Sequence, residues 1–149
     1  MKKLMLSLLA VLLPMSFAIS NVSAHCEIPC GIYDDQLRTQ LIAEHATTIE
    51  KSMKQIMALS KASPVNYNQL VRWVSNKENH ATEIQQIVSQ YFMTQRIKPD
   101  QKMYSEKLAV LHKMLIAAMK CKQTTDLANV EALRARLIEF ETLYFVDSH

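Results

Sequence analysis

The amino-acid sequence predicts an all-α protein whose main body is an antiparallel four-helix bundle. Hydrophobic residues make up 49% of the 149-residue chain, with nine methionines and one glycine, a composition that favours a helical core over a sandwich or barrel. Four segments place apolar side chains three and four residues apart, which is the period of an amphipathic helix. No segment sustains the alternation of Val, Ile and Thr that is typical of strands. Helices of similar length with short connections therefore predict the bundle.

Residues 1–24 have the pattern of a secretory signal peptide. Lys2 and Lys3 form a basic start, an almost unbroken apolar run covers Leu4 to Leu13, and Val22-Ser23-Ala24 supplies small residues before a cleavage point. An uncleaved anchor helix is disfavoured because the apolar run is too short to span a bilayer comfortably. We expect signal peptidase to cleave after Ala24 and the mature protein to be exported, periplasmic or secreted, with no membrane segment.

Cleavage after Ala24 changes the charge and the chemistry of the chain. Removing 24 of the 149 residues leaves 125, and it removes two lysines and no acidic residue, so the net charge becomes about +1. A chain this close to neutral is not expected to bind nucleic acid, which requires a concentrated basic surface. His25 becomes the first residue and carries a free α-amine beside its imidazole.

Residues 25–33, which we call the hook, hold two of the three cysteines and the only glycine. Cys26 and Cys30 are four apart, and in an exported protein such a pair can close a small disulfide loop. Haem attachment is excluded because it needs two residues between the cysteines and a histidine directly after the second. Structural zinc prefers four side-chain ligands, and this segment offers three.

The position of the hook at the mature terminus favours a metal site. The His25 amine, the deprotonated backbone nitrogen of Cys26 and the thiolates of Cys26 and Cys30 can surround one ion in a plane, a geometry typical of nickel(II) or copper(II). The His25 imidazole can approach as an axial ligand. Pro29 stiffens the return of the chain, and Gly31 lets the backbone turn away without a Cβ clash.

The remaining chain, residues 34–149, divides into four predicted helices. Asp34 is expected to cap the first, which runs to about Leu59. The others are expected over residues 66–95, over residues 100–122 after Pro99, and from residues 124–126 onward. The predicted apolar faces include Leu37, Leu41, Ile49, Met53, Leu70, Trp73, Ile84, Tyr91, Phe92, Leu111, Leu133 and Phe140.

Several chemically active side chains on these helices have simpler interpretations. Cys121 is expected to pack as a small hydrophobic residue. His45 and His80 are expected to be hydrogen-bonded histidines of the core or an interface. The chain contains no Glu-x-x-His motif, which argues against a metal site in the core of the bundle. Solvated surface charge is the expected state of Lys51, Lys54, Lys77 and Lys113.

The hook sequence His-Cys-x-x-Pro-Cys-Gly-x-Tyr resembles the nickel hook of nickel superoxide dismutase. Residues 68–81 and 91–96 resemble the helical body of the aquatic-bacterial members of that family, so the likeness covers nearly the whole mature chain. The resemblance implies a right-handed four-helix bundle, a hexamer with one nickel ion per subunit, and disproportionation of superoxide through a Ni(II)/Ni(III) cycle.

The resemblance also implies roles for individual residues. His25 would supply the amine and the axial imidazole, Cys26 its backbone nitrogen and thiolate, and Cys30 the second thiolate. Pro29 matches a proline that is cis in the family. Tyr33 matches the tyrosine that lies over the open face of the metal and limits access to small anions. The expected catalytic residues are thus His25, Cys26, Cys30 and Tyr33.

Two other classes of function remain open from the residues alone. One is a periplasmic helical protein that binds or delivers copper or nickel through the same hook without turnover. The other is a structural helical module with a Cys26–Cys30 disulfide.

His80 falls near the arginine that the family uses to orient the axial imidazole, so the outer contacts of the site are not fixed by the resemblance.

Overall fold

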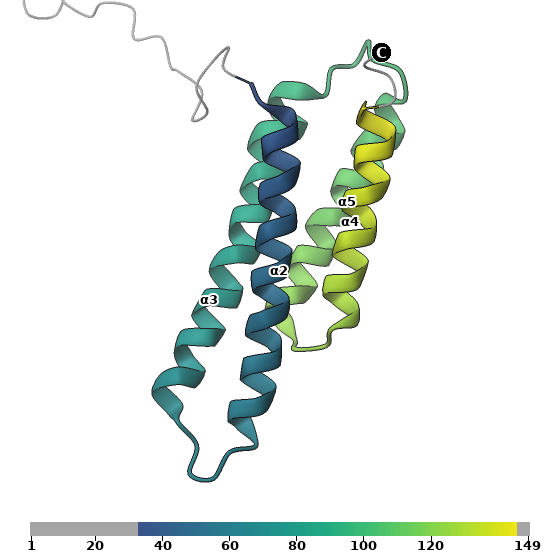
Figure 1. Ribbon diagram of the computed structural model, residues 1–149. Coiled ribbons are helices and arrows are strands. Elements are labelled where there is room, and N and C mark those ends of the chain that lie inside the picture. Colours follow the sequence, from purple (N-terminus) through teal and green to yellow (C-terminus); the bar gives the residue numbers. More distant parts are fainter. Residues whose placement is uncertain (1–32, 146–149) are drawn as a thin grey trace, which may run out of the picture. The chain divides into compact units, whose positions relative to one another are not determined.

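A computed structural model describes residues 33–145, and these residues form four antiparallel helical rods (Figure 1). The rods are α2 (Asp35–Ser60), α3 (Tyr67–Gln86) with η1 (Ile87–Arg96) as its direct continuation, α4 (Tyr104–Gln123) and α5 (Ala128–Phe145). Packing joins α2 to α3, α3 to α4, α4 to α5, and α5 back to α2. The all-α bundle predicted from sequence is confirmed. The predicted signal peptide, all of the hook except Tyr33, and residues 146–149 lie outside the described range.

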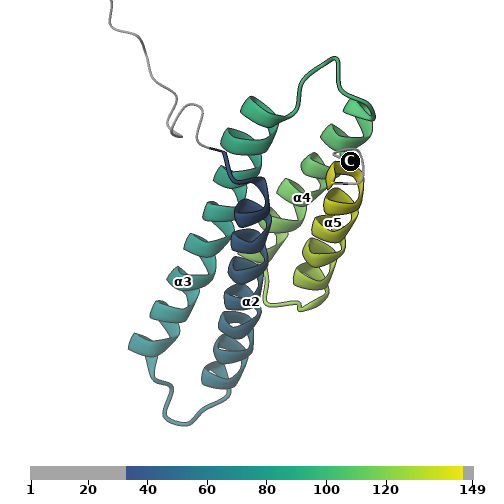
Figure 2. The ribbon, with the colours of Figure 1, turned by 45° about the horizontal axis from the view of Figure 1, so that its top comes forward.

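The two halves of the bundle differ in length. The loop between α2 and α3 extends beyond the loop between α4 and α5 (Figure 2). The start of α2 and the end of α5 lie at the opposite end of the bundle, together with η1 (Figure 1). No helix within residues 33–145 has a stretch long and apolar enough to cross a membrane.

The first two helices begin where their capping residues predict. The Asp34 carboxylate accepts a hydrogen bond from the Leu37 amide at 2.9 Å, and the Asn66 side chain accepts one from the Gln69 amide at 3.1 Å. Each bond satisfies a backbone donor that the first helical turn leaves without a partner. The predicted cap at Asp34 and the predicted starts of both helices are confirmed.

The third helix begins later than predicted. Helix α4 starts at Tyr104 rather than at about residue 100, because Met103 has a left-handed backbone with φ of 54°. The preceding turn is held by Gln101, whose side chain donates to the Arg96 carbonyl at 3.0 Å and accepts from the Lys98 amide at 3.2 Å. A side chain that satisfies the backbone of its own turn competes with continued helix.

The predicted second helix is a continuous rod, but its last part has π-helical hydrogen bonding. In η1 the bonds join residues five apart, and the Ile97 amide continues the pattern by donating to the Phe92 carbonyl at 2.9 Å. Such segments are rare and occur frequently at functional sites. Because the wider turn brings residues five apart toward one face, Tyr91 and Arg96 both reach the first turn of α2.

The core contains apolar side chains from all four rods and an aromatic cluster near the start of α2. Phe92 packs edge-on against Tyr91, Phe140 and Tyr144 with ring centroids 5.0, 4.8 and 5.7 Å away. Leu37 is 46% exposed, so its assignment to the buried face was wrong. The largest fully buried side chains are Tyr91, Phe92, Phe140, Ile42, Ile49, Met53, Ile84, Leu111, Met114 and Leu133.

Lys77 is not the solvated surface charge that the sequence predicts. Its side chain is 4% exposed, and its ammonium donates to the Cys121 carbonyl at 2.7 Å, to the Lys122 carbonyl and to the Glu78 carboxylate at 3.0 Å. The carbonyls at the end of a helix have no partner within the helix and carry a partial negative charge. Lys77 of α3 therefore caps the C-terminal end of α4.

Replacing Lys77 with methionine is expected to lower the free energy of unfolding by about 1–3 kcal/mol, because buried carbonyls lose their donor. The measurement is urea unfolding followed by circular dichroism. The matched control is Lys113→Met, since Lys113 lies on the exposed side of α4. Equal stability of the two variants would contradict the capping role.

Candidate functional site

Tyr33 is the one predicted site residue within the described range. It lies directly before α2 and is 38% exposed. Its ring packs edge-on against Tyr91 with centroids 6.0 Å apart, and the Arg96 guanidinium carbon lies 4.4 Å from its centroid. A guanidinium at this distance from an aromatic face attracts the ring electrostatically. The predicted ligands His25, Cys26 and Cys30 lie outside the described residues.

The side chains beside Tyr33 meet at one carboxylate, Asp35. Arg96 forms a two-pronged ion pair with it, with Nε 2.8 Å from Oδ1 and a terminal nitrogen 2.8 Å from Oδ2. The Tyr91 hydroxyl donates to Oδ1 at 2.5 Å, and the Tyr144 hydroxyl donates to Oδ2 at 2.8 Å. We call Asp35, Tyr91, Arg96 and Tyr144 the Asp35 cluster. It joins the first turn of α2 to η1 and to the end of α5.

The ionisation of the Asp35 cluster follows from these contacts. Burial would raise the pKa of Asp35, but hydrogen bonds from Arg96, Tyr91 and Tyr144 outweigh it and hold the pKa below its ordinary value. Burial and the neighbouring carboxylate raise the pKa of Tyr144 to about 12 and raise the pKa of Tyr91 further. At neutral pH the cluster thus holds one carboxylate, one guanidinium and two phenols that donate.

A cavity of about 530 Å³ opens beside the Asp35 cluster. Its lining carries three cationic side chains and one carboxylate, so a positive local potential is expected there. The residues that line it are Asp35, Arg96, Gln101, Lys102, Lys107, Tyr144 and Phe145. The lining of this cavity therefore favours an anion over a cation.

Sequence reasoning missed three of the four members of the Asp35 cluster. Tyr91 was predicted only as part of an apolar face, and Asp35, Arg96 and Tyr144 were given no role. Helical periodicity pairs residues three and four apart, whereas Tyr91 and Arg96 meet through a five-residue spacing in η1. Asp35 gave no signal of its own, because an acid in the first turn of a helix is already favoured by the helix dipole.

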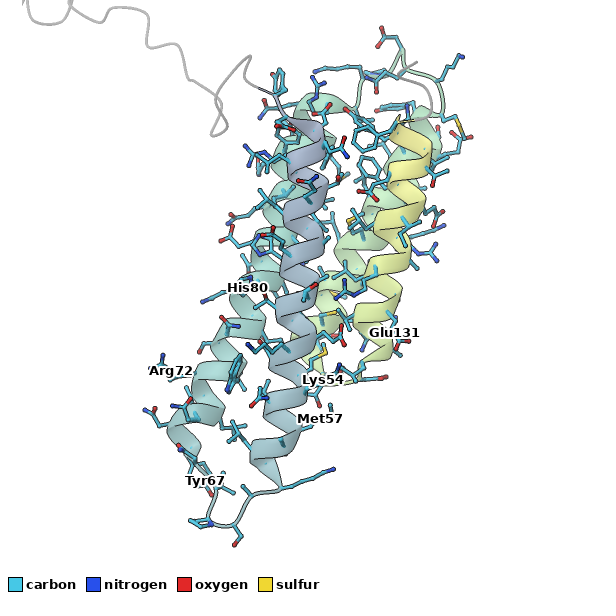
Figure 3. All side chains as sticks on the ribbon, in the orientation of Figure 1. Lys54, Met57, Tyr67, Arg72, His80 and Glu131 are labelled. Atoms are coloured by element: carbon cyan, nitrogen blue, oxygen red, sulfur yellow. The ribbon has the colours of Figure 1, made fainter. Side chains whose placement is uncertain are left out.

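His45 and His80 are hydrogen-bonded histidines, as the sequence predicts, and the structure shows that they pair with each other. Their Nδ1 atoms are 2.7 Å apart across α2 and α3, and both side chains are partly buried. His80 lies midway along the rod formed by α3 and η1 (Figure 3). At this distance the Nδ1 of one ring must donate a proton and the Nδ1 of the other must accept it. The resulting hydrogen bond links α2 to α3.

The His45–His80 pair is expected to make stability depend on pH. Burial and the adjacent His80 hold the pKa of His45 below its ordinary value of 6.5, while Glu83 and Glu44 oppose this. Near pH 6.5 the unfolded chain therefore binds a proton at His45 that the folded chain does not bind. The free energy of unfolding is highest above this pH and decreases as the pH falls below it.

We expect the melting temperature to fall between about pH 7 and pH 5.5, as thermal unfolding followed by circular dichroism would measure. His45→Gln should flatten this dependence, whereas His112→Gln, a change at an exposed histidine, should leave it intact. An identical slope in both variants would contradict the assignment to the pair.

Cys121 is fully buried, as predicted, and burial raises the pKa of its thiol to about 11. A buried neutral thiol is neither a nucleophile nor a metal ligand. Among residues 33–145, no group of three or more His, Cys, Asp or Glu side chains could hold a metal ion.

The predicted nickel ligands belong to the hook, which lies outside the described residues except for Tyr33. Two cysteines, an imidazole and, after the predicted cleavage, a terminal amine would form a mixed nitrogen and sulfur donor set, and such a set suits nickel chemically. Tyr33, the last residue of that segment, lies against the Asp35 cluster within the described range.

Comparison with known proteins identifies the family of the chain. Residues 20–147 match the family described as nickel-containing superoxide dismutase. Comparisons with curated proteins and with solved structures found no match. The matched range covers the hook and all four helical rods, and members of this family are enzymes that contain nickel and act on superoxide. The chain belongs to the nickel-containing superoxide dismutase family.

Proposed function

We propose that the mature protein begins at His25 and disproportionates superoxide at that terminus, so that two superoxide ions and two protons give one O2 and one H2O2. The observation that carries the proposal is the hook motif directly after a signal-peptide cleavage pattern, in a chain of this family. When bound by the hook, nickel would supply the one-electron redox chemistry of a Ni(II)/Ni(III) couple.

The residues of the hook would hold the metal and control access to it. The His25 amine, the Cys26 backbone nitrogen and the thiolates of Cys26 and Cys30 donate electron density, which makes the oxidised metal accessible. The His25 imidazole would be a further ligand. Tyr33, held by Arg96 and Tyr91, limits the approach to small anions.

The positive surroundings of this end of the bundle support an anionic substrate. Arg96, Lys102 and Lys107 line the cavity beside the Asp35 cluster. Cationic walls raise the local concentration of an anion and its rate of encounter. Export to the periplasm or outside the cell, processing by signal peptidase and assembly into a homo-oligomer, a hexamer in the family, belong to the same proposal.

The test begins with the secreted protein. Mass spectrometry should find a chain that starts at His25, elemental analysis one nickel per subunit, and stopped-flow spectroscopy an accelerated decay of superoxide. A nickel-loaded protein that does not accelerate the decay would instead indicate metal binding or delivery. A different first residue, or a mass two hydrogens too low from a Cys26–Cys30 disulfide, would contradict the proposed site.

The three cysteines provide a matched set of variants. Cys26→Ser and Cys30→Ser should abolish both nickel binding and activity, because each removes a thiolate ligand. Cys121→Ala should retain both, since Cys121 is buried in the bundle and serves as a packed side chain. Loss of nickel in Cys121→Ala with normal helicity would contradict the assignment of the ligands to the hook.

A further inference from the structure

Asp35 has more polar partners than a helix start requires. The capping of α2 is already supplied by Asp34, whose carboxylate accepts from the Leu37 amide. Asp35 instead accepts four hydrogen bonds from outside its helix, two from Arg96 and one each from Tyr91 and Tyr144. Three of these bonds come from η1 and one comes from α5.

The arrangement contributes to fold stability, since the hydrogen bonds outweigh desolvation and hold the pKa of Asp35 below its ordinary value. The pair is partly buried, with the Asp35 side chain 18% exposed and that of Arg96 29% exposed. The two-pronged Arg96 contact and the two tyrosine donors also fix the direction of each side chain, because charge-assisted and two-pronged hydrogen bonds are geometrically specific.

The geometry that the cluster fixes is that of Tyr33. Arg96 and Tyr91 both contact the Tyr33 ring: the Arg96 guanidinium carbon lies 4.4 Å from its centroid, and the Tyr91 and Tyr33 centroids are 6.0 Å apart. Both are also bound to Asp35, so neither can move without breaking a charge-assisted hydrogen bond. Asp35 thus acts on Tyr33 through two intermediates.

We propose that Asp35 is a positioning residue for the metal site, which fixes the Tyr33 end of the hook on the bundle by holding Arg96 and Tyr91 in place. The inference rests on the proposed function, since it takes residues 25–33 as the nickel-binding segment. Fixing one end of a short segment reduces the conformations that its ligands must lose when they close on the ion. The cluster therefore retains nickel rather than reacting itself.

The first test compares Asp35→Asn with Glu50→Gln in nickel-loaded protein. Glu50 is a matched control because it also lies on α2 and pairs with Arg134 and Lys54, far along the helix from Tyr33. Nickel loss to excess EDTA, followed by absorbance, is expected to become about 3- to 10-fold faster in Asp35→Asn, which is less than the 10- to 100-fold effect of a direct partner of a metal ligand. Glu50→Gln should retain the wild-type rate.

A double-mutant cycle separates positioning from general stability. If Asp35 acts through Tyr33, then Tyr33→Ala and the Tyr33→Ala/Asp35→Asn pair should lose nickel at the same rate. Independent, additive effects would overturn the proposal. Should Asp35→Asn fail to fold, Arg96→Lys replaces it, because lysine keeps a cation beside Asp35 but lacks the planar guanidinium that stacks on Tyr33. Wild-type nickel retention in Arg96→Lys would also overturn it.

A readout on metal-free protein distinguishes this inference from the proposed function. With ring-labelled tyrosine, the NMR signal of Tyr33, assigned by its loss in Tyr33→Phe, is expected to shift in Asp35→Asn and to stay in place in Glu50→Gln. A Tyr33 signal unchanged by Asp35→Asn overturns the positioning role. Absence of nickel binding by the wild-type chain would instead overturn the proposed function, with the Tyr33 shift still observed.

Discussion

A mature chain with one additional alanine before His25 is expected to fold normally and to lose at least about 100-fold of its superoxide dismutase activity, since even the outer partners of metal ligands are worth 10- to 100-fold. The extension converts the His25 amine into an amide. It also moves the imidazole away from the terminus, so the fused chelate rings through Cys26 cannot form. The measurement is stopped-flow decay of superoxide together with nickel content.

The control for this extension is one alanine added after His149. It changes the length and mass by the same amount and leaves the hook untouched, so activity should be retained. Circular dichroism of both proteins should give the same helicity, because α2 to α5 begin only after Tyr33. Full activity of the N-terminally extended protein would contradict the ligand role of the amine, whatever its nickel content.

The helices were predictable because their signals are local. The side chains of Asp34 and Asn66 cap the helices that they precede, and periodic apolar residues identify the faces that pack. The prediction of the hook rests on equally local signals, since two cysteines and a histidine stand within six residues directly after a signal-peptide pattern. The start of α4 was misplaced because a left-handed residue at Met103 leaves no mark in the periodicity.

The contacts that surround the site were not predictable from local patterns. Asp35 is 61 residues from Arg96 and 109 from Tyr144, and Lys77 is 44 residues from the Cys121 carbonyl that it caps. Each of these charged residues looks like a solvated residue in sequence. Their burial depends on how the rods align, which periodicity does not specify. The five-residue spacing of η1 added a second obstacle.

The bundle core and Tyr33 share aromatic contacts. The Phe92 ring packs edge-on against Tyr91 and contacts Phe140 and Tyr144 of α5. Tyr91 and Tyr144 in turn donate to Asp35. Packing of η1 against α5 therefore fixes the same side chains that hold Tyr33, and damage to this packing should affect both stability and the metal site.

Replacing Phe92 with alanine is expected to lower the free energy of unfolding by about 3–5 kcal/mol, the cost typical of deleting a large buried aromatic side chain. Phe92 is fully buried and makes three edge-on ring contacts, so both apolar area and aromatic pairing are lost. Denaturant unfolding of metal-free protein followed by circular dichroism measures the change, and the melting temperature should fall by on the order of 10–20 °C.

The control is Tyr67→Ala at the opposite end of α3, where the side chain is 72% exposed (Figure 3). This change also deletes an aromatic ring from the same rod, but it should alter stability by less than about 0.5 kcal/mol. Phe92→Ala should in addition release nickel faster than Tyr67→Ala, because Tyr91 loses the ring that packs edge-on against it. A Phe92→Ala protein that is destabilised but retains nickel as well as Tyr67→Ala does would contradict a role of Phe92 in supporting the contact between Tyr91 and Tyr33.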